Sequence, residues 1–186
     1  MRGLTPFQTL GPFFDFGLVL PEGAVVAQPI AAGRHVTIAG TVRDGAGDAL
    51  PDALIEVWQA NAAGKYAHPA DEQATPVDPA CDGFGRVATD VLGQFEFSTV
   101  IPGRVPGPDG TLQAPHLAIG FLARGLLTRL VTRLYFDDEP SNSEDPVLAL
   151  VPAERRSTLI ARREGANRYR FDIMLQGPGE TAFFDV

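Results

Sequence analysis

The segment TLQAPHLAIGFL, residues 111–122, contains the residue whose position most strongly suggests metal chemistry, His116. Side chains alternate between the two faces of a strand, so positions 116 and 118 share one face if HLAIGFL is a strand. Two histidines at this spacing would direct two imidazoles at one point, but position 118 is alanine. This strand therefore offers a single imidazole.

The elements that position His116 are predicted to be mostly strands. Alternation in HVTIAGTVR places Val36, Ile38 and Val42 on one face, which is the period of a half-buried strand. Further strands are expected over 53–59, 93–99, 116–122, 130–136 and 168–175, the last with Tyr169, Phe171, Ile173 and Leu175 facing inward. Twenty glycines and 16 prolines indicate many turns between short strands.

This pattern predicts an all-β fold, an antiparallel β-sandwich with long loops such as the Gly-, Pro- and Asp-rich stretch 61–85. Residues 35–59 are expected to form a hairpin or a turn between packed sheets. One short helix is predicted over 152–164, because Pro152 suits a first turn and Arg162 and Arg163 lie near the negative end. Its arginines are expected to form a solvated face.

Length and composition indicate one domain, 1–186, without a repeat or a dividing linker. A net charge of −8 and an isoelectric point near 4.8 argue against nucleic acid and membrane surfaces as partners. The interrupted apolar pattern near the N-terminus predicts neither an export signal nor a membrane span. A single cysteine, Cys81, excludes an internal disulfide, is expected to be a packing residue, and suits a reducing cytoplasm.

Four segments together resemble the intradiol ring-cleaving dioxygenases, and they extend over nearly the whole chain. They are TPFQTLGPFF, GTVRDGAGDALPDALIEVWQANAAGKY, TRLYFDDE and YRFDIMLQGPGETAFFDV. The hairpin segment alone also suits unrelated sandwich modules, whereas the N-terminal element, TRLYFDDE and the GETAFFD end are more specific. The resemblance implies a ferric ion held by two tyrosines, two histidines and a solvent hydroxide, because ferric iron favours anionic oxygen ligands.

Mapped onto this sequence, the family's ligand set is incomplete. Tyr66 stands at the first tyrosine position and His116 at the first histidine position, but Val105 replaces the second tyrosine and Ala118 the second histidine. Valine and alanine have no donor atoms, so the resemblance implies neither a metal ligand nor a catalytic residue in this chain. Tyr66 and His116 are then remnants, although His68 could in principle be a replacement ligand.

The resemblance implies a two-chain enzyme in which a homologous beta subunit holds Fe(III) and this chain, inactive alone, lines the substrate pocket. The N-terminal arm 1–34 would reach the partner, and the sandwich would occupy 35–186. The residues expected to contact a small aromatic carboxylate are Thr9, Gly11, Pro12, Phe13 and Arg133. Phe13 stands where related chains often have tyrosine. An alternative for Arg133 is an outward strand residue paired with Asp137 or Asp138.

Two other functions stay open at this point. One is a non-enzymatic, transthyretin-like sandwich binding module that shares only the hairpin, and the other is a stand-alone dioxygenase with substituted iron ligands. The N-terminal TPFQTLGPF element and the FFDV end have no evident purpose in a binding module. They favour the dioxygenase subunit.

Overall fold

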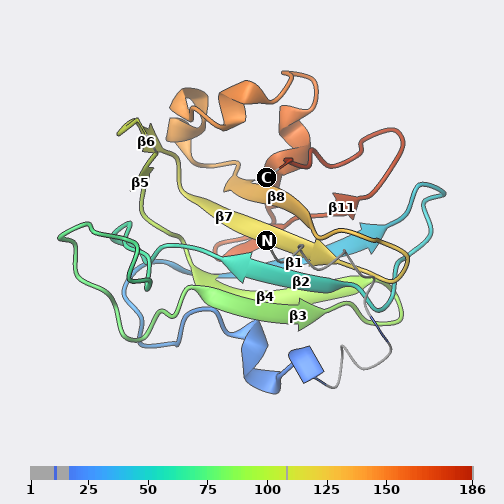
Figure 1. The fold of residues 1–186 in the computed structure, drawn as a ribbon, viewed down its shortest axis with the longest axis horizontal. Coiled ribbons are helices and arrows are strands. Elements are labelled where there is room, and N and C mark those ends of the chain that lie inside the picture. Colours follow the sequence, from blue (N-terminus) through green and yellow to red (C-terminus); the bar gives the residue numbers. More distant parts are fainter. Residues whose placement is uncertain (1–10, 12–16, 108, 186) are drawn as a thin grey trace, which may run out of the picture.

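The structure is a computed structural model that describes residues 11, 17–107 and 109–185, and it is built mainly from strands (Figure 1). The strands are β1 (His35–Arg43), β2 (Leu54–Trp58), β3 (Phe84–Ala88), β4 (Gln94–Val100), β5 (Val105–Pro106), β6 (Leu112–Gln113), β7 (His116–Leu122), β8 (Leu130–Phe136), β9 (Ile160–Arg163), β10 (Arg168–Arg170) and β11 (Ile173–Met174). Short 3-10 turns are η1 (Pro21–Ala24), η2 (Pro140–Glu144), η3 (Leu148–Leu150) and η4 (Arg156–Leu159).

Nine of these strands form one hydrogen-bonded sheet in the order β11-β1-β10-β9-β8-β7-β2-β3, with β4 paired to β1. The edge strand β3 contacts β4, so the sheet nearly closes into a barrel. The mostly-β prediction is therefore confirmed, and the expected strands 35–43, 116–122 and 130–136 match β1, β7 and β8. The two separate layers of a sandwich stay a prediction, because β9 connects the two halves of the sheet.

The pairing is mixed and not purely antiparallel as predicted. β1 runs parallel to β10 and β11, and β8 runs parallel to β9. Residues 35–59 do not form a hairpin, since β1 pairs with β4 while β2 pairs with β3 and β7. The turn between them instead carries the chain from one part of the sheet to another.

The predicted strand 168–175 is interrupted after Arg170. The Thr41 N–H donates to the side-chain Oδ1 of Asp172 at 2.9 Å, so a carboxylate replaces a backbone acceptor at this point of the ladder. β11 then resumes pairing with β1 at Ile173. The inward-facing pattern holds, because Tyr169, Phe171 and Ile173 are buried and Leu175 is partly buried.

The predicted helix over 152–164 is wrong. Residues 156–159 form the 3-10 turn η4, and residues 160–163 form β9, which fills the space between β8 and β10. Ile160 and Ala161 pair with Tyr135 and Phe136 of β8. These sheet hydrogen bonds and the burial of Leu159 and Ala161 outweigh the helix-end signals on which the prediction depended.

The main hydrophobic core lies inside the curled sheet, and Val36, Ile38 and Val42 of β1 are part of it as predicted. A second cluster packs Tyr135 of β8 beneath the turns η3 and η4. Cys81 is buried, consistent with a packing residue. Within the described part of the chain, no helix is long and apolar enough to cross a membrane.

Candidate functional site

The site lies on the outer face of β2, β7 and β8, which is opposite the core. Leu117, Ile119 and Leu134 belong to the core, so the residues that alternate with them face outward. The strand register places Trp58 of β2 opposite Ala118 of β7, and Ala118 opposite Arg133 of β8. His116 lies on the same face, opposite Tyr135.

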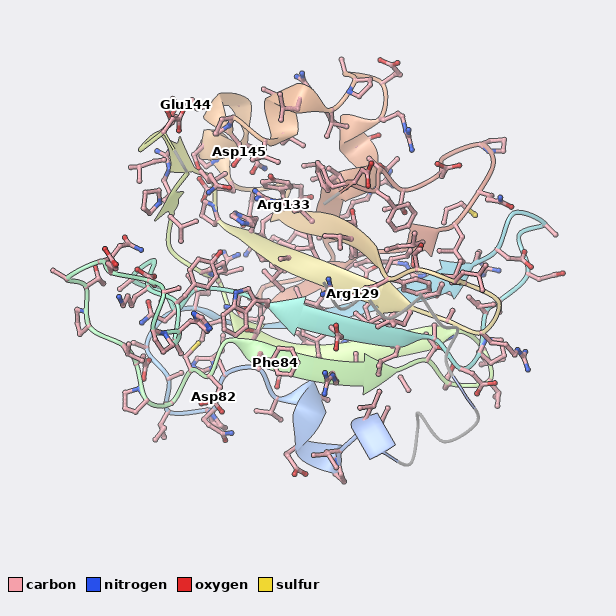
Figure 2. All side chains as sticks on the ribbon, in the orientation of Figure 1. Asp82, Phe84, Arg129, Arg133, Glu144 and Asp145 are labelled. Carbon is pink, nitrogen blue, oxygen red and sulfur yellow. The ribbon has the colours of Figure 1, made fainter. Side chains whose placement is uncertain are left out.

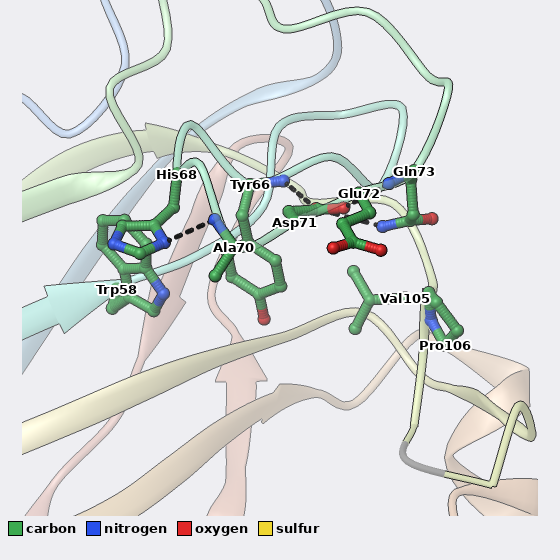
Figure 3. A pocket seen from close by; sticks show the side chains of 9 residues that line it. All are labelled: Trp58, Tyr66, His68, Ala70, Asp71, Glu72, Gln73, Val105 and Pro106. Carbon is green, nitrogen blue, oxygen red and sulfur yellow. Dashed lines mark hydrogen bonds between the residues drawn. The ribbon is translucent and has the colours of Figure 1, made fainter.

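A hollow of about 440 Å³ opens beside this face. Figure 3 shows its lining: Trp58, Tyr66, His68, Ala70, Asp71, Glu72, Gln73, Val105 and Pro106. Tyr66 and Val105, which are far apart in the sequence, thus line one hollow. Together with His116 and Ala118 on the neighbouring strand, they form what we call the remnant site, the four positions Tyr66, Val105, His116 and Ala118.

Tyr66 is positioned by a tight turn after β2. The Asn61 side chain accepts the N–H groups of Ala63 and Lys65 at 2.9 and 3.0 Å, and Gly64 adopts a positive φ of 81°. A Cβ at Gly64 would overlap the carbonyl oxygen of Arg104, so glycine is needed both for conformation and for space. The Tyr66 ring then stacks on Trp58, with ring centroids 5.7 Å apart.

An ion pair between Lys65 and Asp71 stabilises the loop that lines the other side of the hollow. Lys65 Nζ lies 3.2 Å from Asp71 Oδ1, and both side chains are largely buried. Asp71 also accepts the backbone N–H of Tyr66 at 2.8 Å. Desolvation opposes ionisation of Asp71, but the hydrogen bonds from Tyr66, Gln73 and Lys65 outweigh it and lower its pKa to about 2. A charged Asp71 therefore holds the Tyr66 backbone in place.

His116 is buried and neutral. Its Nδ1 lies 2.8 Å from the carbonyl oxygen of Ala114 and donates to it, which leaves Nε2 without a proton. Burial lowers the pKa of His116 to about 4, and the positive charge of Arg133 adds to the decrease. His68 lines the same hollow as Tyr66. Its Nδ1 accepts the Ala70 N–H, and its ring lies edge-on to Trp58.

Arg133 is half-buried and bonded within its own chain. Its Nη1 donates to Gln113 Oε1 at 2.6 Å and to the Tyr135 hydroxyl at 3.3 Å. The Tyr135 hydroxyl in turn donates to the buried carboxylate of Asp145 at 3.0 Å. Figure 2 shows Arg133 and Asp145 on the part of the molecule where β7 and β8 meet the C-terminal turns.

The alternative pairing of Arg133 with Asp137 or Asp138 is not found. Asp138 binds Arg34 and Arg163, and Asp137 accepts the backbone N–H of Arg163. The sequence prediction also missed the residues that hold Arg133, which are Gln113, Tyr135 and Asp145. Of these three, Tyr135 could have been indicated by the sequence, because strand alternation places it on the same face as Arg133.

The pKa of Tyr66 also reflects Arg133. Burial raises the pKa of the Tyr66 phenol above its usual value, the charge of Arg133 opposes the increase, and Asp71 adds to it. Of the N-terminal arm residues that were predicted to contact the substrate, Gly11 is described, and it is exposed. Thr9, Pro12 and Phe13 lie outside the described residues.

Known proteins that are similar to this chain are dioxygenases or their subunits. A family model described as Dioxygenase matches residues 22–177. The chain is 42% identical to the protocatechuate 3,4-dioxygenase alpha chain of Burkholderia cepacia, over 98% of this chain and 97% of that one. It is 37% identical to the beta chain from the same organism, over 80% of this chain and 67% of that one. The structure of 3-chlorocatechol 1,2-dioxygenase from Rhodococcus opacus shares the fold, with a TM-score of 0.65 at 22% identity over 84% of this chain and 66% of that one.

The chain belongs to the intradiol dioxygenase family. It is a homologue of both chains of a protocatechuate 3,4-dioxygenase, and it matches the alpha chain over nearly its full length. The family match extends far beyond the hairpin, so a binding module that shares only the hairpin is not supported.

The family is iron-dependent, but the residues at the remnant site do not fit a ferric ion. Val105 and Ala118 have no donor atoms, and the charge of Arg133 acts on both Tyr66 and His116. Across the described residues, no group of three or more His, Cys, Asp or Glu side chains could hold a metal. The chain's own donor set therefore gives no basis for iron chemistry here.

Proposed function

We propose that this chain is the iron-free alpha subunit of a protocatechuate 3,4-dioxygenase. A homologous beta subunit holds Fe(III), and the two chains together form the pocket for O2-dependent cleavage of 3,4-dihydroxybenzoate to 3-carboxy-cis,cis-muconate. The carbon–carbon bond between the two hydroxylated carbons breaks, and both oxygen atoms of O2 enter the product. We also propose a cytoplasmic location, in keeping with the single, buried Cys81.

The observation that carries this proposal is the combination of a full-length likeness to an alpha chain with an incomplete ligand set. A stand-alone dioxygenase would need four protein donors in one place, whereas the remnant site offers Tyr66 and His116. The likeness to a beta chain as well suggests that the partner has the same fold. An alpha-beta hetero-oligomer accounts for both observations.

The role of this chain in the complex is to bind and orient the substrate. We propose that Arg133, together with Thr9, Gly11, Pro12 and Phe13 of the N-terminal arm, lines the pocket beside the partner's iron. A guanidinium lowers the cost of holding the substrate carboxylate as an anion. The sequence pair Gly-Pro suits such a lining, because glycine lets the backbone approach an aromatic ring closely and proline restricts its conformation.

The test compares this chain alone with this chain co-expressed with a candidate beta subunit. Iron per chain, visible tyrosinate-to-iron absorption and oxygen uptake on 3,4-dihydroxybenzoate are measured for both samples. We expect the chain alone to be colourless, iron-free and inactive, and the pair to be coloured and active. Stoichiometric iron and oxygen uptake in the chain alone would overturn the proposal in favour of a stand-alone enzyme.

A further inference from the structure

Ala118 and Arg133 are direct cross-strand neighbours on β7 and β8. Side chains in such a pair start only about 5 Å apart and point to the same face. The alanine side chain ends at its Cβ and has no donor atom, whereas Arg133 extends over this face to Gln113 and to the Tyr135 hydroxyl. A histidine at position 118 would place its ring on the same face as the guanidinium. The sequence therefore has a cation beside the position where the family has a metal-binding imidazole.

The guanidinium is held in this position by other side chains. Gln113 and Tyr135 accept hydrogen bonds from Nη1, and Asp145 fixes the Tyr135 hydroxyl. Asp145 is itself fixed, because it is buried and accepts the backbone N–H groups of Ala114 and Leu148, each at 2.7 Å. The positive charge is therefore a fixed feature of the site.

Tyr135 connects the charge to the remnant site, because its hydroxyl accepts a hydrogen bond from Arg133 and its ring centroid lies 5.7 Å from that of His116. The positive charge of Arg133 lowers the pKa of the Tyr66 phenol and of the His116 imidazole, the two donor groups at the family's ligand positions. The unprotonated Nε2 of His116 is a competent ligand atom by itself. What opposes a metal ion here is the neighbouring cation as well as the two missing donors.

We infer that Arg133 excludes metal ions from the remnant site, because its guanidinium supplies the positive charge that a metal would otherwise bring. An incoming cation would be repelled by a fixed cation in a partly desolvated site, where the repulsion is screened less than in water. The inference predicts that restoring the donor atoms alone does not restore metal binding. It concerns this chain alone and does not depend on the partner subunit.

The test uses the full chain with both lost donors restored, Val105→Tyr/Ala118→His. This background is compared in three forms: with Arg133, with Arg133→Gln, and with Arg133→Lys, which keeps the charge. Each protein is loaded with Fe(II) without oxygen and exposed to air, and its iron content and phenolate-to-iron absorption are measured after gel filtration. We expect one coloured iron per chain in the Arg133→Gln form only, with an apparent affinity about a hundredfold above the other two.

A second set leaves the buried Val105 unchanged in case the larger substitution prevents folding. Ala118→His is compared with Ala118→His/Arg133→Gln, and Co(II) is titrated against the fluorescence of Trp58, the single tryptophan, which stacks on Tyr66. We expect quenching at about hundredfold lower Co(II) concentration when Arg133 is replaced.

Three results would overturn the inference. The first is equal metal binding with and without Arg133 in either set. The second is metal binding by the Arg133→Lys form as tight as by the Arg133→Gln form, which would make space and not charge the cause. The third is a folded Arg133→Gln protein that binds no metal in either set. None of these results depends on the beta subunit, so they leave the proposed function to its own test.

Discussion

At the residue scale, Arg133 has two proposed roles, and its geometry is compatible with both. The two hydrogen bonds that Arg133 donates to other described residues use one nitrogen, Nη1. A guanidinium has five N–H groups, so others remain to bind a substrate carboxylate. A side chain fixed by Gln113 and Tyr135 loses little freedom when it binds such an anion.

Replacement of Arg133 by alanine in the two-chain complex is expected to raise KM for 3,4-dihydroxybenzoate by about tenfold or more, because a charge-assisted hydrogen bond to the carboxylate is lost. Iron content of the complex should not change. Steady-state oxygen uptake measures the effect, and catechol, which lacks the carboxylate, should show little of it. Arg168→Ala, which removes an exposed arginine paired with Glu96, is the control for net charge. Unaltered kinetics in Arg133→Ala would remove this residue from the pocket.

His116 makes the stability of the chain depend on pH. Its pKa of about 4 in the folded protein lies below the usual 6.5, so the unfolded chain binds the proton more readily. The contribution of neutral His116 to the stability of the folded chain is fully present above pH 6.5, and it is lost as the pH falls from 6.5 towards 4. We expect the free energy of unfolding to fall by about 2–3 kcal/mol over this window through this one group.

The measurement is urea unfolding at several pH values for the native chain and for His116→Gln. The variant lacks the titrating group and should be less stable at pH 7 but lose less stability between pH 6.5 and 4. Parallel curves for the two proteins would show that His116 titrates normally in the folded chain.

The sequence located the residues of the remnant site but not what surrounds them. Tyr66, Val105, His116 and Ala118 could be found because each stands in a short motif. Gln113 and Asp145 could not, because their roles depend on hydrogen bonds from Arg133 and Tyr135 of β8 to β6 and to the segment between η2 and η3, which no local pattern encodes. The same limit explains why Lys65 and Asp71 were missed.

At the element scale, the strands 35–43, 116–122 and 130–136 were predicted well, and the segments around β9 and β10 were not. β1, β7 and β8 are rich in apolar and β-branched residues and each places side chains in the core, which makes them recognisable from the sequence. The segment 152–164 carries helix-end signals worth a few tenths of a kcal/mol each, whereas β9 gains hydrogen bonds from strands on both sides. Neighbours distant in sequence decide its structure.

Gly40 allows β1 to pass close to the segment between β10 and β11. A Cβ at this position would overlap the carbonyl oxygen of Phe171 and the ring of Phe95. We expect Gly40→Ala to destabilise the chain by about 3 kcal/mol, because backbone on one side and a buried ring on the other cannot both move. Gly165→Ala, where a Cβ would meet nothing within 4 Å, should change stability by less than about 0.5 kcal/mol. Equal urea midpoints for the two variants would contradict this account.

At the scale of the whole molecule, the chain has the family fold, whereas the donor atoms of its remnant site do not fit a ferric ion. The family match spans β1 to β11, and the strands enclose a large buried hydrophobic cluster. Ala118 and His116 lie on the face of β7 that is opposite the core, and Val105 lies in the separate β5–β6 pair. Substitutions at these positions can therefore change the site without disturbing the core of the main sheet.

The molecule also exposes apolar surface that suits a subunit. A hollow of about 580 Å³ lies between the start of β8 and the C-terminal segment, lined in part by Leu130, Val131, Phe183 and Phe184. Leu127 directly precedes Thr128, which lines this hollow, and it is 67% exposed. Exposed apolar patches of this kind commonly mark protein interfaces.

We expect the chain, when expressed without a partner, to self-associate or aggregate, because the described residues leave Leu127 and this apolar hollow exposed. Sedimentation velocity over a wide concentration range measures the association. Leu127→Asp should reduce it, since a charge beside the hollow is costly to bury, whereas Val91→Asp, at a still more exposed position in the turn before β4, should not. Co-expression with the beta chain should replace the mixture by one defined complex. A chain that remains a monomer at every concentration would contradict this expectation. It would mean that the exposed apolar surface does not drive self-association, and that assembly with the beta chain depends on contacts other than this hollow.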